Sequence, residues 1–170
     1  MSVKKRSLRW LVLTVFMPLL WGCPYESDFP LIAASEAVID HALIGEWEPA
    51  EEQDASPGAM SILPFNEREL VIVGTERGKE DVGLLRAISS AVDGELFLSV
   101  QEVSSKGPKR WALVNYQVLG DRLFLRIVDE ALFSRRFGSS SDLRDFVRVQ
   151  LNNPDLYGSD RIQIWKRVER

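Results

Sequence analysis

The chain has 170 residues, with 21 Lys and Arg against 25 Asp and Glu, and a formal net charge of −4. An acidic protein repels the phosphate backbone, so we expect no nucleic-acid partner. The single cysteine, Cys23, excludes an intrachain disulfide framework. The single histidine, His41, excludes a His-based catalytic triad or a multi-His metal site within one chain.

The first 22 residues are typical of a secretory leader. A basic start without acidic residues precedes an apolar run from Trp10 to Trp21; the basic residues are Lys4, Lys5, Arg6 and Arg9. The run is shorter than the roughly 20 residues that a membrane-spanning helix needs, and Pro18 interrupts it. The pattern therefore predicts a signal peptide over residues 1–22. Its removal leaves 17 basic against 25 acidic residues, a formal charge of −8.

The end of this leader, Leu20-Trp21-Gly22-Cys23, resembles the lipobox of bacterial lipoproteins at Leu20, Gly22 and Cys23. The resemblance implies cleavage after Gly22, a diacylglyceryl group on the Cys23 sulfur and acylation of the new amino terminus. Several acyl chains give effectively permanent membrane attachment. An ordinary cleaved signal and an uncleaved anchor, with Cys23 a bystander, are the alternatives. Pro24 stands where an Asp would retain such a protein in the inner membrane, which favours the outer membrane, facing the periplasm, over the outer leaflet of the plasma membrane.

Residues 23–42 are expected to follow as the acylated cysteine, a tether through about Ala34 and a short helical turn from Ser35 to Ile39. This segment is expected to hold the domain off the bilayer. His41 is predicted to be a surface or hinge residue rather than a catalytic base.

Residues 43–170 are predicted to form a single, mostly β domain. Apolar runs of strand length alternate with turn signals at short spacing, which is typical of an antiparallel sheet of about eight strands, closed as an up-and-down barrel or strongly curled. The expected strands are Leu43–Trp47, Met60–Leu63, Leu70–Thr75, Leu84–Ser89, Leu96–Glu102, Trp111–Leu119, Leu123–Val128 and Ile162–Val168.

Two hairpins and one helix are predicted from local chemistry. Gly120-Asp121 suits a type II′ turn, and a two-residue loop there sets Val118 opposite Leu123. Asp93-Gly94 marks a second hairpin. A helix is expected over Leu143–Leu151, before the last strand, because capping side chains at 139–142 precede apolar residues at helical spacing.

Gly45-x-Trp47, at the start of the first strand, resembles the G-x-W signature of the calycin superfamily, which includes lipocalins. The resemblance implies a calycin-like barrel in which Trp47 plugs the closed end and a basic residue of the last strand packs across it. Arg161, Lys166 and Arg167 are the candidates for that partner. Alternatively, Trp47 is an ordinary core residue. The Leu-x-Gly-x-Trp start also resembles bacterial lipoproteins for which no activity is established. Structural or ligand-pocket candidates are Gly45, Trp47, Trp111, Tyr116, Phe124, Trp165 and Arg167.

No catalytic, metal or cofactor motif is recognisable in the sequence. Carboxylates gather at Glu46, Glu48, Glu51, Glu52 and Asp54, but without the spacing of a calcium loop, so a solvated acidic loop is expected. The favoured function is a non-enzymatic, lipid-anchored envelope lipoprotein that contacts another envelope protein or the cell wall. The alternative is a carrier that binds a small apolar ligand inside the barrel. A filled interior favours the first and an aromatic-lined cavity the second.

Overall fold

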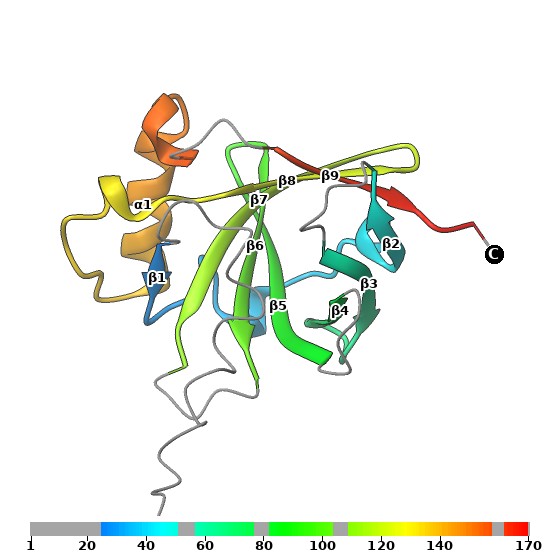
Figure 1. The fold of residues 1–170 in the computed structure, drawn as a ribbon. Helices are drawn as coiled ribbons and strands as arrows, with labels where there is room; N and C mark the ends of the chain where they lie inside the picture. Colours follow the sequence, from blue (N-terminus) through cyan, green and yellow to red (C-terminus); the bar gives the residue numbers. More distant parts are fainter. Residues whose placement is uncertain (1–24, 51–56, 77–81, 104–108, 158–161, 170) are drawn as a thin grey trace, which may run out of the picture.

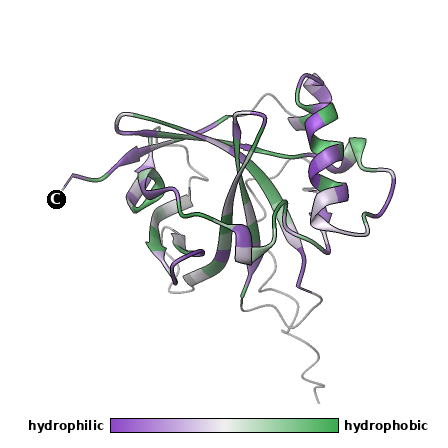
Figure 2. Cartoon of the chain, turned by 180° about the vertical axis from the view of Figure 1, so that it is seen from behind, coloured by the Kyte–Doolittle hydropathy of each residue, from purple (hydrophilic) through white to green (hydrophobic). Residues whose placement is uncertain are grey.

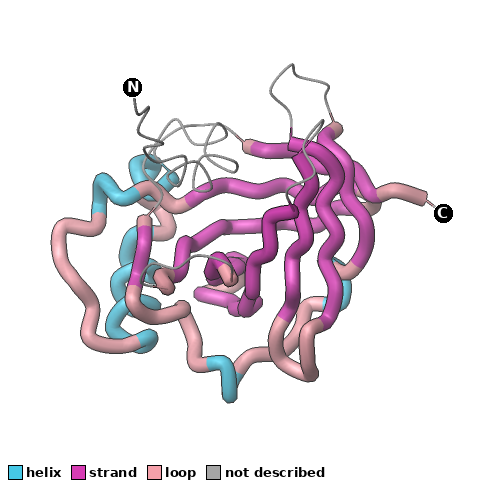
Figure 3. The backbone as a smooth tube through the Cα atoms, turned by 60° about the horizontal axis from the view of Figure 1, so that its bottom comes forward, coloured by secondary structure: helices cyan, strands magenta, loops and turns pink. Residues whose placement is uncertain are grey.

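The fold is an up-and-down β-barrel of eight antiparallel strands, β2 to β9, with one extra short strand, β1 (Figure 1). The computed structural model describes residues 25–50, 57–76, 82–103, 109–157 and 162–169. Neighbouring strands pair in chain order from β2 to β8, and β9 closes the ring between β8 and β2. The strands are β1 Glu26–Ser27, β2 Gly45–Pro49, β3 Pro57–Pro64, β4 Leu70–Glu76, β5 Val82–Val92, β6 Glu95–Glu102, β7 Trp111–Leu119, β8 Arg122–Ile127 and β9 Gln163–Arg167. Figure 3 shows the strands curling around a common interior.

Both predicted hairpins are confirmed, and turn chemistry explains them. Gly120 has a φ of +62° while Asp121 has no positive φ, as a type II′ turn requires, and Val118 lies opposite Leu123. Asp93 and Gly94 both have positive φ, +48° and +92°, as in a type I′ turn. These two short loops fix the register of β5 with β6 and of β7 with β8.

The barrel interior is filled by the residues that alternate inward along each strand. Hydrophobic and hydrophilic residues alternate visibly along the ribbon in Figure 2. The fully packed part of this core holds Leu43, Trp47, Met60, Ile62, Leu70, Ile72, Ala87, Leu98, Tyr116, Leu123 and Trp165. It contains both tryptophans of the first and last barrel strands, so the ends of the chain's β-domain are joined through one core.

A second core lies outside the barrel, where helix α1 (Ser140–Gln150) covers the wall. The predicted helix is confirmed, since the Ser139 hydroxyl accepts a hydrogen bond from the Asp142 amide at 3.1 Å and caps it. Its buried residues Leu143 and Val147 join a cluster with Phe97 and Leu113 from β6 and β7. The 3₁₀ helices η4 (Glu130–Leu132) and η5 (Pro154–Tyr157) flank it. Most of the helical structure thus gathers on one side of the barrel (Figures 1 and 3).

The expectation of a tether is wrong for residues 25–34, which pack on the barrel. β1 pairs with β7, and the side chain of Leu31 is fully buried while its amide bonds the Ser99 hydroxyl at 3.0 Å. The single helical turn expected here is replaced by two 3₁₀ turns, η2 (Ala34–Glu36) and η3 (His41–Leu43). The segment runs over the outer face of the barrel wall and then turns into the capped end. Burial of its apolar residues compensates for the lost chain entropy.

Candidate functional site

The candidate site is the barrel interior, which has one end closed by the chain itself. Trp47 is fully buried at this end, and its indole Nε1 donates a hydrogen bond to the Leu43 carbonyl at 2.9 Å. The guanidinium of Arg167, opposite Trp47 on β9, stacks over the indole with its Cζ 4.1 Å from the ring centroid. Arg167 also donates to the carbonyls of Ile44 and Ala42, each at 2.6 Å. The arginine therefore joins the last strand, the first strand and η3 in one cap.

Gly45 is required by this cap. Its φ of +150° lies where residues with a Cβ are rarely found, and a Cβ placed there would overlap the Arg167 guanidinium. Gly45, Trp47 and Arg167 are therefore one packing unit, in the geometry that the G-x-W resemblance implies for the closed end of a barrel. Of the three basic candidates, Arg167 packs on Trp47, Lys166 is exposed, and Arg161 lies outside the described residues.

A buried polar contact lies beside the cap. The Tyr116 hydroxyl donates to Asp40 Oδ2 at 2.9 Å, and Asp40 also accepts from the Ala42 amide at the start of η3. Ser89 donates to the Val38 carbonyl at 2.7 Å. Burial, together with the bond to the Asp40 carboxylate and its charge, raises the pKa of Tyr116. Tyr116 therefore fastens the entering chain to the inside of the barrel as a neutral phenol.

Towards the opposite end of the interior, the inward side chains of the described residues are less buried. On each of four neighbouring strands, one inward residue is buried, and the inward residue two positions closer to this end is only partly buried. The pairs are Ala87 and Leu85 on β5, Leu98 and Val100 on β6, Tyr116 and Val114 on β7, and Leu123 and Leu125 on β8. We call Leu85, Val100, Val114 and Leu125 the open ring. Solvent reaches these inward side chains although they stand within a closed barrel.

The open ring is aliphatic, and two aromatic side chains of the interior lie next to it. Trp165 and Tyr116 are buried in the same cluster against which the ring packs. Gln163 on β9 lies directly opposite Leu125 and adds one half-buried amide at this level. Such a surface, apolar with few polar groups, favours a small apolar ligand over a charged one.

Two of the structural or ligand-pocket candidates do not line the interior. Trp111 is buried on the outer wall against Ala37 and Ile88, and Phe124 faces outward opposite Gln117. The period of two along a strand explains this, because their neighbours Ala112 and Leu125 occupy the inner face. Trp165 and Tyr116 do line the interior.

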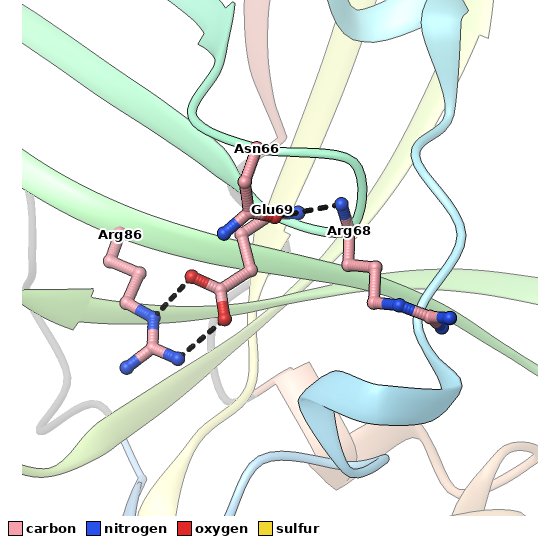
Figure 4. A network of polar contacts seen from close by, with 4 residues as sticks. All are labelled: Asn66, Arg68, Glu69 and Arg86. Carbon is pink, nitrogen blue, oxygen red and sulfur yellow. Dashed lines mark hydrogen bonds and ion pairs between the residues drawn. The ribbon is translucent and has the colours of Figure 1, made fainter.

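The outer wall around Trp111 holds an ion pair with a structural role (Figure 4). Glu69, which is buried, accepts two hydrogen bonds from Arg86 at 2.8 and 2.6 Å, and Arg86 lies over the Trp111 ring. Arg68, in the adjoining turn with Asn66, donates to the carbonyl of Ser35. These contacts stabilise the outer wall against which residues 35–37 pack. None of the residues in this network points into the barrel.

The structure describes no site at the remaining residues that the sequence singled out. Leu20, Gly22 and Cys23 lie outside the described residues, as do Glu51, Glu52 and Asp54 of the acidic patch. His41 is exposed, as predicted. Within the described ranges, His, Cys, Asp and Glu nowhere form a group of three that could hold a metal ion. Among the same residues, no helix is both long and apolar enough to cross a bilayer.

No family model matches the sequence, and neither a curated protein nor a solved structure shows significant similarity to it.

Asp40 and Ser89 are the site residues that sequence reasoning missed. Asp40 stands just before His41-Ala42-Leu43, and an Asp two residues before an amide it can bond is a signal for a capped turn. Nothing in the local sequence indicates that the same carboxylate reaches Tyr116, 76 positions away.

Proposed function

We propose that this chain is a non-enzymatic, lipid-anchored lipoprotein of the bacterial cell envelope whose barrel binds a small apolar ligand at its open end. The observation that carries the ligand proposal is the open ring, four inward aliphatic side chains that are partly exposed beside the buried residues Ala87, Leu98, Tyr116 and Leu123. Covering apolar surface inside a barrel with a ligand is favourable by about 25 cal/mol per Å² of surface removed from water.

The packed half of the barrel limits the size of the ligand. Trp47, Ile62 and Leu123 fill the interior towards the capped end and are at most 1 % exposed. A long chain threaded through the barrel is therefore incompatible with this core. The proposal is for a compact or short apolar group that enters only the open half.

The anchoring part of the proposal rests on the lipobox resemblance at Leu20, Gly22 and Cys23. Its test is the Cys23→Ser variant, which we expect to leave the membrane fraction, with loss of the acyl mass from the intact protein. Unchanged fractionation would refute anchoring through Cys23. Fractionation on a density gradient would separate the outer membrane, which Pro24 favours, from the inner.

The ligand proposal is tested by binding of the apolar fluorophore N-phenyl-1-naphthylamine to residues 25–170. Leu125→Glu places a carboxylate in the open ring, and we expect it to weaken binding at least tenfold. Leu119→Glu is the matched control, because Leu119 is 54 % exposed on the neighbouring β7–β8 turn. Equal binding to both variants, with unchanged circular dichroism, would contradict a ligand site in the open ring.

A second candidate function, contact with another envelope protein, is favoured by exposed apolar side chains near the capped end. Val38, Phe65 and Leu63 are 77 %, 66 % and 46 % exposed. Crosslinking in intact cells through photoreactive groups at positions 38 and 65 would capture such a partner. Failure to capture any protein from either position would count against this function.

A further inference from the structure

The first described residues are fastened to the barrel immediately after the proposed lipid anchor. The Tyr25 amide donates to the Val128 carbonyl at 3.0 Å, and β1 follows at once, with Glu26 opposite Ala112 on β7. The Tyr25 side chain is 7 % exposed, and its ring stacks on Phe133 at 3.7 Å between centroids. No slack is left in the chain from Tyr25 onward.

Only Pro24 separates Cys23 from Tyr25. Two residues of fully extended chain span about 7 Å, so an acyl group on Cys23 begins within that distance of the barrel wall. A bilayer that holds those acyl chains then lies close to the residues around Tyr25, farther only by the length of the cysteine side chain and its glyceryl group.

The wall around Tyr25 lies towards the open end of the barrel. β1 pairs with Trp111 and Ala112, the first residues of β7, and that end of β7 is the end at which the open ring stands. In Figure 1, β1 lies beside α1, on the side of the barrel away from β3 and β4. The proposed anchor therefore leaves the molecule between the open rim and the turn after Phe133.

Both basic and acidic side chains flank this exit point. Phe133 and Phe137 both contact Tyr25, and Arg135 and Arg136 between them are exposed. Arg135 is paired with Asp142 at 2.9 Å, whereas Arg136 makes no hydrogen bond or ion pair within the described part of the chain.

Lys109 and Arg110, just before β7, are also exposed. The acids Glu26, in β1, and Asp28, just after β1, are exposed beside them. Lys and Arg near a bilayer are attracted to anionic headgroups. The four basic side chains stand here among acids, because Asp129 and Glu130 follow Val128 and Asp142 pairs with Arg135, so the contact with the bilayer rests on covalent reach rather than on a basic face.

We infer that the barrel rests directly against the bilayer that holds its acyl chains, with the β1 face and the Ser134–Arg136 turn on the lipid headgroups and the open end beside them. The inference rests on the proposed lipidation of Cys23. Because the open ring then stands next to the membrane, an apolar ligand would pass between bilayer and barrel without crossing a wide aqueous gap.

The test uses the full acylated protein in vesicles of phosphatidylethanolamine and phosphatidylglycerol that carry nitroxide-labelled headgroups. Once Cys23 is acylated no other thiol remains, so Ser134→Cys gives a single site for a fluorophore. Glu67→Cys, exposed in the β3–β4 turn across the barrel, is the matched control. We expect quenching by the nitroxides to be at least threefold greater at position 134 than at position 67.

A third variant carries ten Gly/Ser residues inserted between Pro24 and Tyr25, on the Ser134→Cys background. Such a linker has an end-to-end distance of about 18 Å and should reduce quenching at position 134 to the level at position 67. Intact mass and flotation with the vesicles report lipidation separately. Missing acyl mass or absent flotation would refute the proposed anchoring, whereas an acylated, floating protein with equal quenching at both positions would overturn the membrane contact.

Discussion

The two halves of the barrel interior are built from the same strands but differ in how they are packed. Towards the capped end, Leu98 and Leu123 are at most 2 % exposed and lie in one core with Trp47. Two residues further along the same strands, Val100 and Leu125 are only partly buried. The same alternation of apolar residues thus gives a buried core in one half and partly exposed side chains in the other. The two halves differ in whether a described segment outside the strands packs into the barrel.

In the capped half, that additional chain is the segment before β2. Leu43, Asp40 and Ile39 bring apolar and polar groups to the interior, and Arg167 closes over them. The open half receives nothing comparable from the described residues. We therefore expect stability to depend on the capped half and ligand binding on the open half.

Removing the Trp47 indole from the cap should have the largest effect on stability. Trp47→Ala leaves a void among fully packed side chains and removes the stacking partner of Arg167, so we expect a loss of about 3–5 kcal/mol in the free energy of unfolding. Urea unfolding followed by circular dichroism measures it. Phe124→Ala, on the outer face of β8, should cost clearly less. Similar losses for both variants would contradict a special role for the capped half.

Leu123 and Leu125 compare the two halves directly, because they are the same residue type, on the same strand and face. Leu123→Ala should lower the free energy of unfolding by about 2–5 kcal/mol, as for a fully buried leucine. Leu125→Ala, in the open ring, should cost about 1 kcal/mol, since solvent already reaches it. Equal losses in matched urea titrations would mean that the open half is as tightly packed as the capped half.

The sequence predicted the barrel well because the signals for its strands are local. Alternation along Trp111–Leu119 and the turn residues Gly120-Asp121 fix strand, face and register within a few positions. The helix was predicted for the same reason, from the cap at Ser139. Strand ends differ from the prediction by a few residues, as in β5, which runs on to Val92 at the turn.

The parts that the sequence did not predict depend on contacts between distant residues. The amide of Leu31 bonds the Ser99 hydroxyl, 68 positions away, and nothing periodic around Leu31 indicates this, so the segment up to about Ala34 was predicted to be a tether. Trp111 was counted among the aromatic residues that fill or line the barrel, and only the docked segment around Ala37 shows why it is buried on the outer face. A strand with two covered faces does not reveal which one points inward.

Arg167 should have a smaller effect than either core residue, because it lies at the rim of the cap. Arg167→Met removes the hydrogen bonds to the Ile44 and Ala42 carbonyls, and we expect a loss of about 1–3 kcal/mol. Arg167→Lys retains the charge but not the planar group with two donors, so its loss should be intermediate. Thermal melts of the two variants that coincide with that of the parent protein would show that the cap does not depend on this residue.

The smallest effect is expected from the bond between Tyr116 and Asp40. Tyr116→Phe keeps the ring and removes the donor, for an expected loss of about 1 kcal/mol at neutral pH. The pKa of Tyr116 is raised in the folded protein, mainly by burial, so its contribution is complete below the unfolded value of 10 and is lost as pH rises beyond it. Unfolding titrations at pH 8 and pH 11 should therefore show a steeper fall in stability for the parent than for Tyr116→Phe. Tyr25 and Tyr157, whose pKa values are also raised, titrate in both proteins and cancel in the comparison. An identical fall in the two proteins would show that the Tyr116 hydroxyl is not held in the protonated form, and that the capped half closes without this bond.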